Sequence, residues 1–141
     1  MTKQEILRKF EFYREADAQQ KVALENGGQV VQLDAGKFFA LEGCPIEGVA
    51  LVGDGRLRVF KSSSSGREIT LYEVCAGEVC LLNVLTMMTG AAAAASAVVE
   101  KPVTAFLVPN DRFRSWIGTQ AGLRNFVLGA ISTGIVEVMN L

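Results

Sequence analysis

Short apolar runs separated by turn signals occupy residues 29–108. Runs rich in β-branched and aromatic residues, bounded by Gly, Pro, Asn, Asp or Ser, are typical of strands. Alternation in Arg56-Leu57-Arg58-Val59 predicts that its two apolar residues face inward, and Gly53-Asp54-Gly55 has the permissive backbone of a tight hairpin. The rhythm indicates an antiparallel sandwich or barrel, with strands at Val30–Leu33, Phe38–Leu41, Val49–Val52, Leu57–Lys61, Glu68–Val74, Ala97–Glu100 and Val103–Val108.

Helices are predicted ahead of this region, in two pieces. Ile6, Leu7 and Phe10 fall on one face of the first piece, at the spacing of a helical repeat. Asp17 is suited to cap the second piece, and Asn26-Gly27-Gly28 is a strong stop signal.

A sustained apolar stripe marks the end of the chain. Pro109-Asn110-Asp111 predicts the start of one helix, and a second helix is predicted from about Thr119 to the end. Leu128 and Val136 lie off the stripe and form a second apolar strip. A terminal helix that is apolar on two sides needs two partners, so we expect it to pack on its own sheet and on the same helix of a second subunit. The stripe consists of Leu123, Phe126, Val127, Ala130, Ile131, Ile135, Val138 and Met139.

The composition narrows the chemistry. The 141 residues suffice for one compact domain, and a net charge of −1 gives no support for direct nucleic-acid binding. The chain has no histidine, which excludes His-based catalysis, His-ligated haem and the usual zinc sites, so we expect no enzyme, metal or cofactor. The N-terminus is charged and cannot serve as a secretory signal, and the three cysteines show no CxxC spacing. Reduced thiols in a cytoplasm are therefore expected.

Two stretches of low charge, Val79–Val99 and Ala121–Leu141, are long enough to cross a bilayer. Polar residues interrupt the first, which is otherwise rich in alanine, and the second carries Arg124 and Glu137. Neither is expected to span a membrane.

A cassette-like segment follows the central strands. Gly77-Glu78 precedes Val79-Cys80, a short apolar helix and Ala95-Ser96-Ala97. This order resembles the phosphate-binding cassette of cyclic-nucleotide-binding domains. The glycine turns and strands before it, and the long last helix after it, resemble the effector domain of Crp/Fnr-type transcription regulators, from about residue 20 onward.

The resemblance implies a mainly β fold with flanking helices. Residues 29–108 are expected to form a double-stranded β-helix (jelly roll) effector domain. Residues 1–28 are expected to be an N-terminal helical segment, and residues 109–141 the C-terminal helices, including the family's dimerisation helix. The family's helix-turn-helix module, through which DNA would be bound, has no counterpart in these residues, so the chain is expected to be a fragment of a regulator or a stand-alone sensor.

The resemblance also implies a ligand site. In the family the ligand's phosphate lies against backbone N–H groups at the start of the short helix. Glu78 would accept from a ribose hydroxyl and Ser96 would face the phosphate, but Ala95 stands where the family has a phosphate-pairing arginine. The site residues implied in this way are Gly77, Glu78, Val79, Cys80, Leu82, Ala95 and Ser96.

The missing arginine changes the expected ligand. A charge-assisted contact contributes roughly 1.5–3 kcal/mol, whereas a helix terminus contributes roughly 0.3–1 kcal/mol. We therefore expect weak or absent binding of cyclic AMP or cyclic GMP. The run Ala91–Ala95 would form an apolar wall suited to an unknown effector that is uncharged or hydrophobic, or to none.

Two other functions remain open, a thiol-based sensor and a scaffold, and a third, a cupin-type enzyme, lacks its metal ligands. Cys75 and Cys80 are candidates for a thiol-based redox sensor on the same fold, since Cys80 is expected at a helix N-terminus, where the pKa of a thiol falls. The three cysteines do not form the four-cysteine set of an iron–sulfur sensor. A cupin-type enzyme would need histidines for its metal. The chain could also be a degenerate scaffold that only dimerises.

Overall fold

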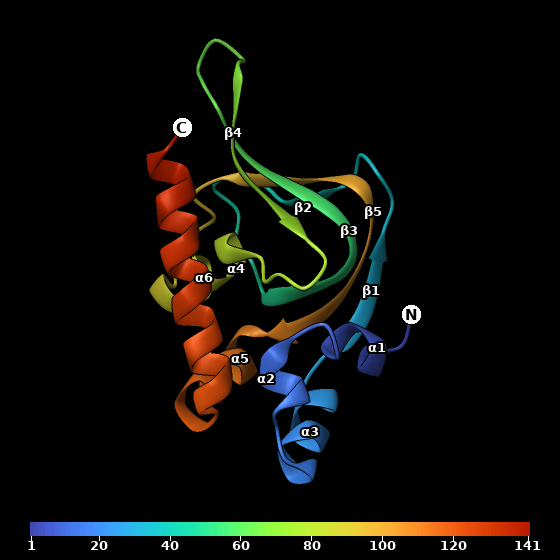
Figure 1. Cartoon of the computed structure of the whole chain (residues 1–141). Helices are drawn as coiled ribbons and strands as arrows, with labels where there is room; N and C mark the ends of the chain where they lie inside the picture. The colour runs from blue at the N-terminus through green and yellow to red at the C-terminus, as the bar shows by residue number, and fades with distance from the viewer.

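The computed structural model describes residues 1–141, and it shows a curled β-sheet flanked by helices (Figure 1). Three short helices precede the sheet, α1 (Lys3–Leu7), α2 (Glu11–Arg14) and α3 (Ala18–Glu25), where two pieces were predicted. The first piece breaks at Phe10, whose backbone is extended and whose ring is buried against Phe12 and Phe126. Asp17 caps α3 as predicted, because its carboxylate accepts a 2.7 Å hydrogen bond from the Gln20 amide.

The sheet has five antiparallel strands in the order β1-β5-β3-β4, with β2 also paired to β5. Their bounds are β1 (Gln29–Leu33), β2 (Phe38–Ala40), β3 (Gly48–Ser62), β4 (Glu68–Cys75) and β5 (Ser96–Pro109). The predicted mainly β architecture is confirmed.

The predicted hairpin at Gly53-Asp54-Gly55 is wrong, because β3 runs straight through it. Its register against β5 shifts on both sides of Asp54, which is the mark of a bulge that bends a strand. Gly55 has φ +88°, and a Cβ at this position would overlap the carbonyl of Pro102. Gly55 therefore permits the close approach of β3 and β5, which are both long and curled. Like β3, the strand β5 joins two segments that were predicted as separate strands.

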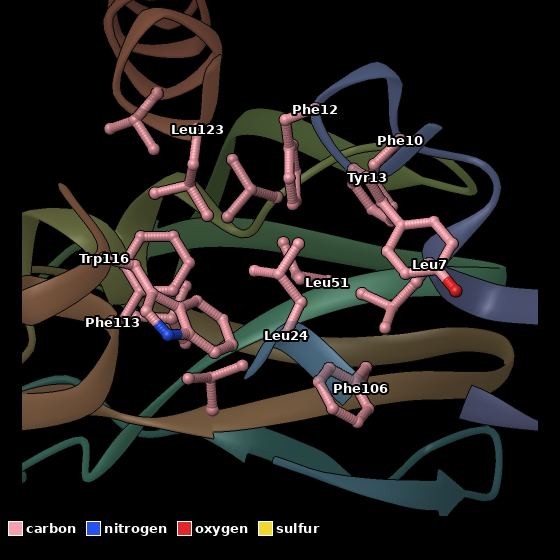
Figure 2. Packing of buried hydrophobic residues seen from close by; sticks show 14 of the residues in the cluster. Leu7, Phe10, Phe12, Tyr13, Leu24, Leu51, Phe106, Phe113, Trp116 and Leu123 are labelled. Atoms are coloured by element: carbon pink, nitrogen blue, oxygen red, sulfur yellow. The ribbon is translucent and has the colours of Figure 1, made fainter. Parts of the chain in front are cut away.

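Two apolar clusters lie on the two faces of β3. Val49 and Leu51 face the outer cluster, to which all six helices and β5 also contribute side chains (Figure 2). Ala50 and Val52 face the inner cluster, inside the curl of the sheet. Because this part of β3 is buried on both faces, its sequence is a continuous apolar run rather than an alternation. Further along, Leu57 and Val59 point into the inner cluster, as the alternation predicts.

Three helices complete the fold: α4 (Leu81–Thr89), α5 (Asn110–Thr119) and α6 (Ala121–Met139). Figure 1 shows α6 along one side of the sheet, with α4 between them. Leu123, Val127 and Gly134 are the buried residues of α6, whereas Ile135 and Val136 are more than half exposed. The apolar C-terminal half of α6 is thus largely uncovered within one chain. None of the helices combines the length and hydropathy that a membrane span requires.

Candidate functional site

The turn at Gly77-Glu78 closes on itself. Gly77 has φ +84°, a conformation that glycine adopts at little cost. Glu78 accepts a 2.7 Å hydrogen bond at Oε1 from the Cys75 amide, and the Glu78 amide donates to the Cys75 carbonyl at 3.1 Å. The Gly77 amide donates a hydrogen bond to the Val52 carbonyl, and the Val52 amide donates one to the Glu78 carbonyl. These two bonds hold the turn against β3. The Glu78 carboxylate therefore has a structural partner already.

The cassette helix α4 is anchored on β3 by a buried amide. Asn83 is fully buried, and its Oδ1 accepts a 3.0 Å hydrogen bond from the Ala50 amide. The helix starts after Cys80, which provides no side-chain cap, and ends at Gly90 in the left-handed conformation. The far end is held from α5, where Arg114 donates a 2.6 Å hydrogen bond to the Met87 carbonyl.

Ala95 and Ser96 follow α4, and both are engaged within the fold. Ala95 is 2% exposed and packs in the inner cluster. The Ser96 hydroxyl accepts a 3.0 Å hydrogen bond from the Glu42 amide. Lys61 is the cation beside this segment, and its Nζ is occupied by the Glu42 carboxylate at 3.0 Å and the Ala94 carbonyl at 2.9 Å.

Two neighbouring pockets divide the implied site residues. The first, here called the apolar pocket, has a volume of about 310 Å³ and is lined by Leu82 and Ala95 together with side chains of β3, β4 and the C-terminal half of α6. The second, here called the acidic pocket, has a volume of about 450 Å³ and is lined by Gly77, Glu78 and Val79 together with side chains of β4 and α6.

Neither pocket has the charge of a phosphate site. No Lys or Arg is among the residues that line either one. The acidic pocket carries the carboxylates of Glu73, Glu78 and Glu137. Cys80 and Ser96 line neither pocket, so the single cradle that the resemblance implies is two compartments in this structure.

Tyr72, Leu81 and Gly134 line both pockets and form the wall between them. A Cβ at Gly134 would overlap Leu81 Cδ2, so α6 approaches α4 closely at this glycine. The Tyr72 hydroxyl is buried, and no acceptor lies within hydrogen-bonding distance of its proton; the Leu82 amide faces its oxygen as a donor. Burial raises the pKa of Tyr72 far above its ordinary value, the Cys80 thiol adds to this rise, and the nearby Leu82 amide opposes it. Sequence reasoning did not single out Tyr72, because nothing in its local pattern distinguishes it from an ordinary strand aromatic.

The two redox candidates do not have the environment that was expected of them. Cys80 lies at the start of α4 as predicted, but it is fully buried, and desolvation raises its pKa to about 11 instead of lowering it. Cys75 is exposed, yet partial desolvation and then the carboxylates of Glu78 and Glu73 raise its pKa as well. A thiol with a raised pKa holds little of the nucleophilic thiolate at neutral pH. No group of three or more His, Cys, Asp and Glu side chains is placed to hold a metal ion.

Comparison with known families agrees with this arrangement of a curled sheet, a short helix and a long terminal helix. The sequence profile described as "Cyclic nucleotide-binding domain" matches residues 30–120. The chain therefore belongs to the cyclic nucleotide-binding domain family, as its motifs predicted. No curated protein sequence matches the chain.

Solved structures share the fold at low sequence identity. A protein described as a transcriptional regulator of the Crp/Fnr family from Eubacterium rectale superposes with a TM-score of 0.82 at 23% identity, covering 94% of this chain and 61% of that one. The catabolite activator protein of Thermus thermophilus gives 0.74 at 18% identity, covering 89% and 58%. The sensor domain of the transcriptional regulator DNR from Pseudomonas aeruginosa gives 0.73 at 17% identity, covering 97% and 91%. The predicted Crp/Fnr-type architecture is confirmed, and the chain spans less than two thirds of the length of the first two proteins.

Proposed function

We propose that this chain is the effector-sensing domain of a Crp/Fnr-type transcription regulator and that its effector is an uncharged small molecule rather than a cyclic nucleotide. The observation that carries the proposal is the burial of Ala95 against the inner cluster. The resemblance to the family implies that this residue stands in place of the phosphate-pairing arginine. The apolar pocket beside Ala95 is of a size that small ligands occupy.

Electrostatics weighs against a phosphate at this site. Loss of the arginine removes roughly 1.5–3 kcal/mol of charge-assisted hydrogen bonding, which exceeds the roughly 0.3–1 kcal/mol available from the N-terminus of α4. Lys61, the cation beside the cassette, is already held by Glu42 and Ala94. The carboxylates around the acidic pocket repel an anion further.

The same domain is proposed to dimerise through α6. Exposed apolar side chains concentrate in its C-terminal half, where Ile135, Val136 and Met139 are 54%, 56% and 78% exposed. A symmetric pair of α6 helices would cover them. Because α6 also forms a wall of both pockets, an effector that binds one arrangement of α6 better than another would shift the geometry of the dimer and of any DNA-binding module attached to it.

Calorimetric titration of the purified chain with cyclic AMP and cyclic GMP tests the proposal. The expected result is no saturable binding below about 100 µM ligand, since the lost arginine contact weakens affinity roughly ten- to hundredfold. A known cyclic-nucleotide receptor titrated in parallel serves as the positive control. Saturable binding in the low micromolar range would overturn the proposal.

A further inference from the structure

Tyr72 has a hydroxyl group that the fold buries and leaves without a hydrogen-bond acceptor, since the group that faces its oxygen, the Leu82 amide, is a donor. Buried polar groups in native proteins are nearly always hydrogen-bonded, so an orphaned one calls for a physical explanation. The chain offers its own comparison, because its other tyrosine, Tyr13, donates a 3.1 Å hydrogen bond to Glu25. An orphaned hydroxyl in the wall of a ligand pocket is explained if a ligand supplies the missing partner.

The surroundings of Tyr72 restrict that ligand. The other residues that line the apolar pocket are Gly, Ala, Val, Leu, Ile and Met, so the Tyr72 hydroxyl is the one polar side-chain group among them. A single polar group in an apolar pocket fixes the orientation of a ligand and selects for a matching polar atom. On the other side of the ring the acidic pocket carries carboxylates, which disfavour a negatively charged ligand group.

We infer that the effector is a neutral amphiphile, with an apolar body in the apolar pocket and one uncharged hydrogen-bonding group that meets the Tyr72 hydroxyl at the wall between the two pockets. This inference rests on the proposed function and goes further, since it names the ligand class and the residue that selects it. Solvent does not reach the hydroxyl in the present arrangement, in which Leu81 packs against Gly134. Binding at the hydroxyl therefore requires a side chain of the wall to move, and Leu81, whose flexible end lies against Gly134, is the candidate.

Three probes of nearly equal shape test the inference: ethylbenzene is apolar, acetophenone carries a neutral acceptor, and benzoate carries a negative charge. Affinities are measured by NMR titration, with the methyl resonances of Leu82 and Ile135 reporting occupancy of the apolar pocket. The wild-type chain is expected to bind acetophenone about three- to tenfold more tightly than ethylbenzene, because one hydrogen bond is gained. Benzoate is expected to bind more weakly than either.

Tyr72→Phe is expected to remove the preference for acetophenone while leaving ethylbenzene binding unchanged. Tyr13→Phe is the matched control, since it removes a hydroxyl outside the residues that line these pockets, and should keep the preference. Equal binding of the two neutral probes to the wild-type chain, a preference that survives Tyr72→Phe, or tight binding of benzoate would overturn the inference while leaving an apolar effector pocket intact. Failure of both neutral probes to bind would instead refute the proposed function.

Discussion

The contact between Gly134 and Leu81 predicts opposite effects for the same substitution at two glycines of α6. A Cβ at Gly134 would overlap Leu81 Cδ2, whereas a Cβ at Gly129 would have no atom within 4 Å. Alanine within a helix is more favourable than glycine by roughly 0.5–1 kcal/mol, so Gly129→Ala should stabilise the fold by about that amount.

At Gly134 the same gain is offset by overpacking. Forcing a methyl group into a packed site costs roughly 1–3 kcal/mol. Leu81 is only 7% exposed, and the end of its side chain would have to leave its packed position against Gly134 to make room for the methyl group. Gly134→Ala should therefore destabilise the fold by about 0.5–2 kcal/mol, which is the difference between the packing cost and the helical gain.

Urea denaturation of both variants at one fixed protein concentration measures these changes, because the proposed dimerisation would make apparent stability depend on concentration. Repeating Gly134→Ala in a Leu81→Ala background provides a double-mutant cycle, in which the packing penalty should disappear. If Gly134→Ala stabilises the chain as much as Gly129→Ala does, α6 does not close on α4 at this contact, and the wall between the two pockets is misplaced.

Three further predictions concern the thiols and α6. Because burial raises the pKa of Cys80 from 9.0 to about 11, the folded state keeps its proton where the unfolded state loses it. The free energy of unfolding should therefore fall by roughly 2–3 kcal/mol between about pH 9 and pH 11. In denaturation curves, Cys80→Ala should remove this part of the decline. If the free energy of unfolding of the variant has the same pH dependence as that of the wild type, the thiol is not buried. In native protein at neutral pH, a thiol reagent should modify Cys44 within minutes and Cys80 only on unfolding, which mass spectrometry measures. Rapid modification of Cys80 would support the alternative function as a thiol-based redox sensor. Val136→Glu should weaken dimerisation at least tenfold by analytical ultracentrifugation, whereas Ser115→Glu, at an exposed position of α5, should leave it unchanged. Equal dimerisation by wild type and Val136→Glu would exclude a dimer through this face of α6.

Local sequence signals were sufficient for most of the fold. The capping residue Asp17, the inward alternation around Leu57 and the turn at Gly77-Glu78 all depend on neighbours within a few positions, and the structure has them as predicted. The predictions are wrong where contacts with residues distant in the sequence determine the local backbone conformation. The helix breaks at Phe10 because Phe126 contributes to the site that buries its ring. Gly55 is in a bulge rather than a hairpin because β5 passes against it.

The candidate site was harder to predict for the same reason. The sequence identifies Ala95 as the departure from the family, and the structure adds that no Lys or Arg lines either pocket. Division of the cradle into two pockets depends on the approach of Gly134 to Leu81, which are far apart in the chain. The raised pKa of Cys80 depends on complete burial, which outweighs the effect of the helix N-terminus on which the sequence prediction relied. Tyr72 carries no local signal because its missing partner is a property of the packed structure.

The central claim is that a receptor pocket of the cyclic nucleotide-binding fold has no means here of recognising a phosphate. Parallel titrations of the purified chain with cyclic AMP and with adenosine, which lacks the charged group, test it most directly. The account predicts that adenosine binds at least as well as cyclic AMP, because no Lys or Arg lines either pocket and one of the two pockets carries three carboxylates. A preference of tenfold or more for cyclic AMP would contradict it, because such a preference requires a favourable contact of roughly 1.4 kcal/mol with the phosphate.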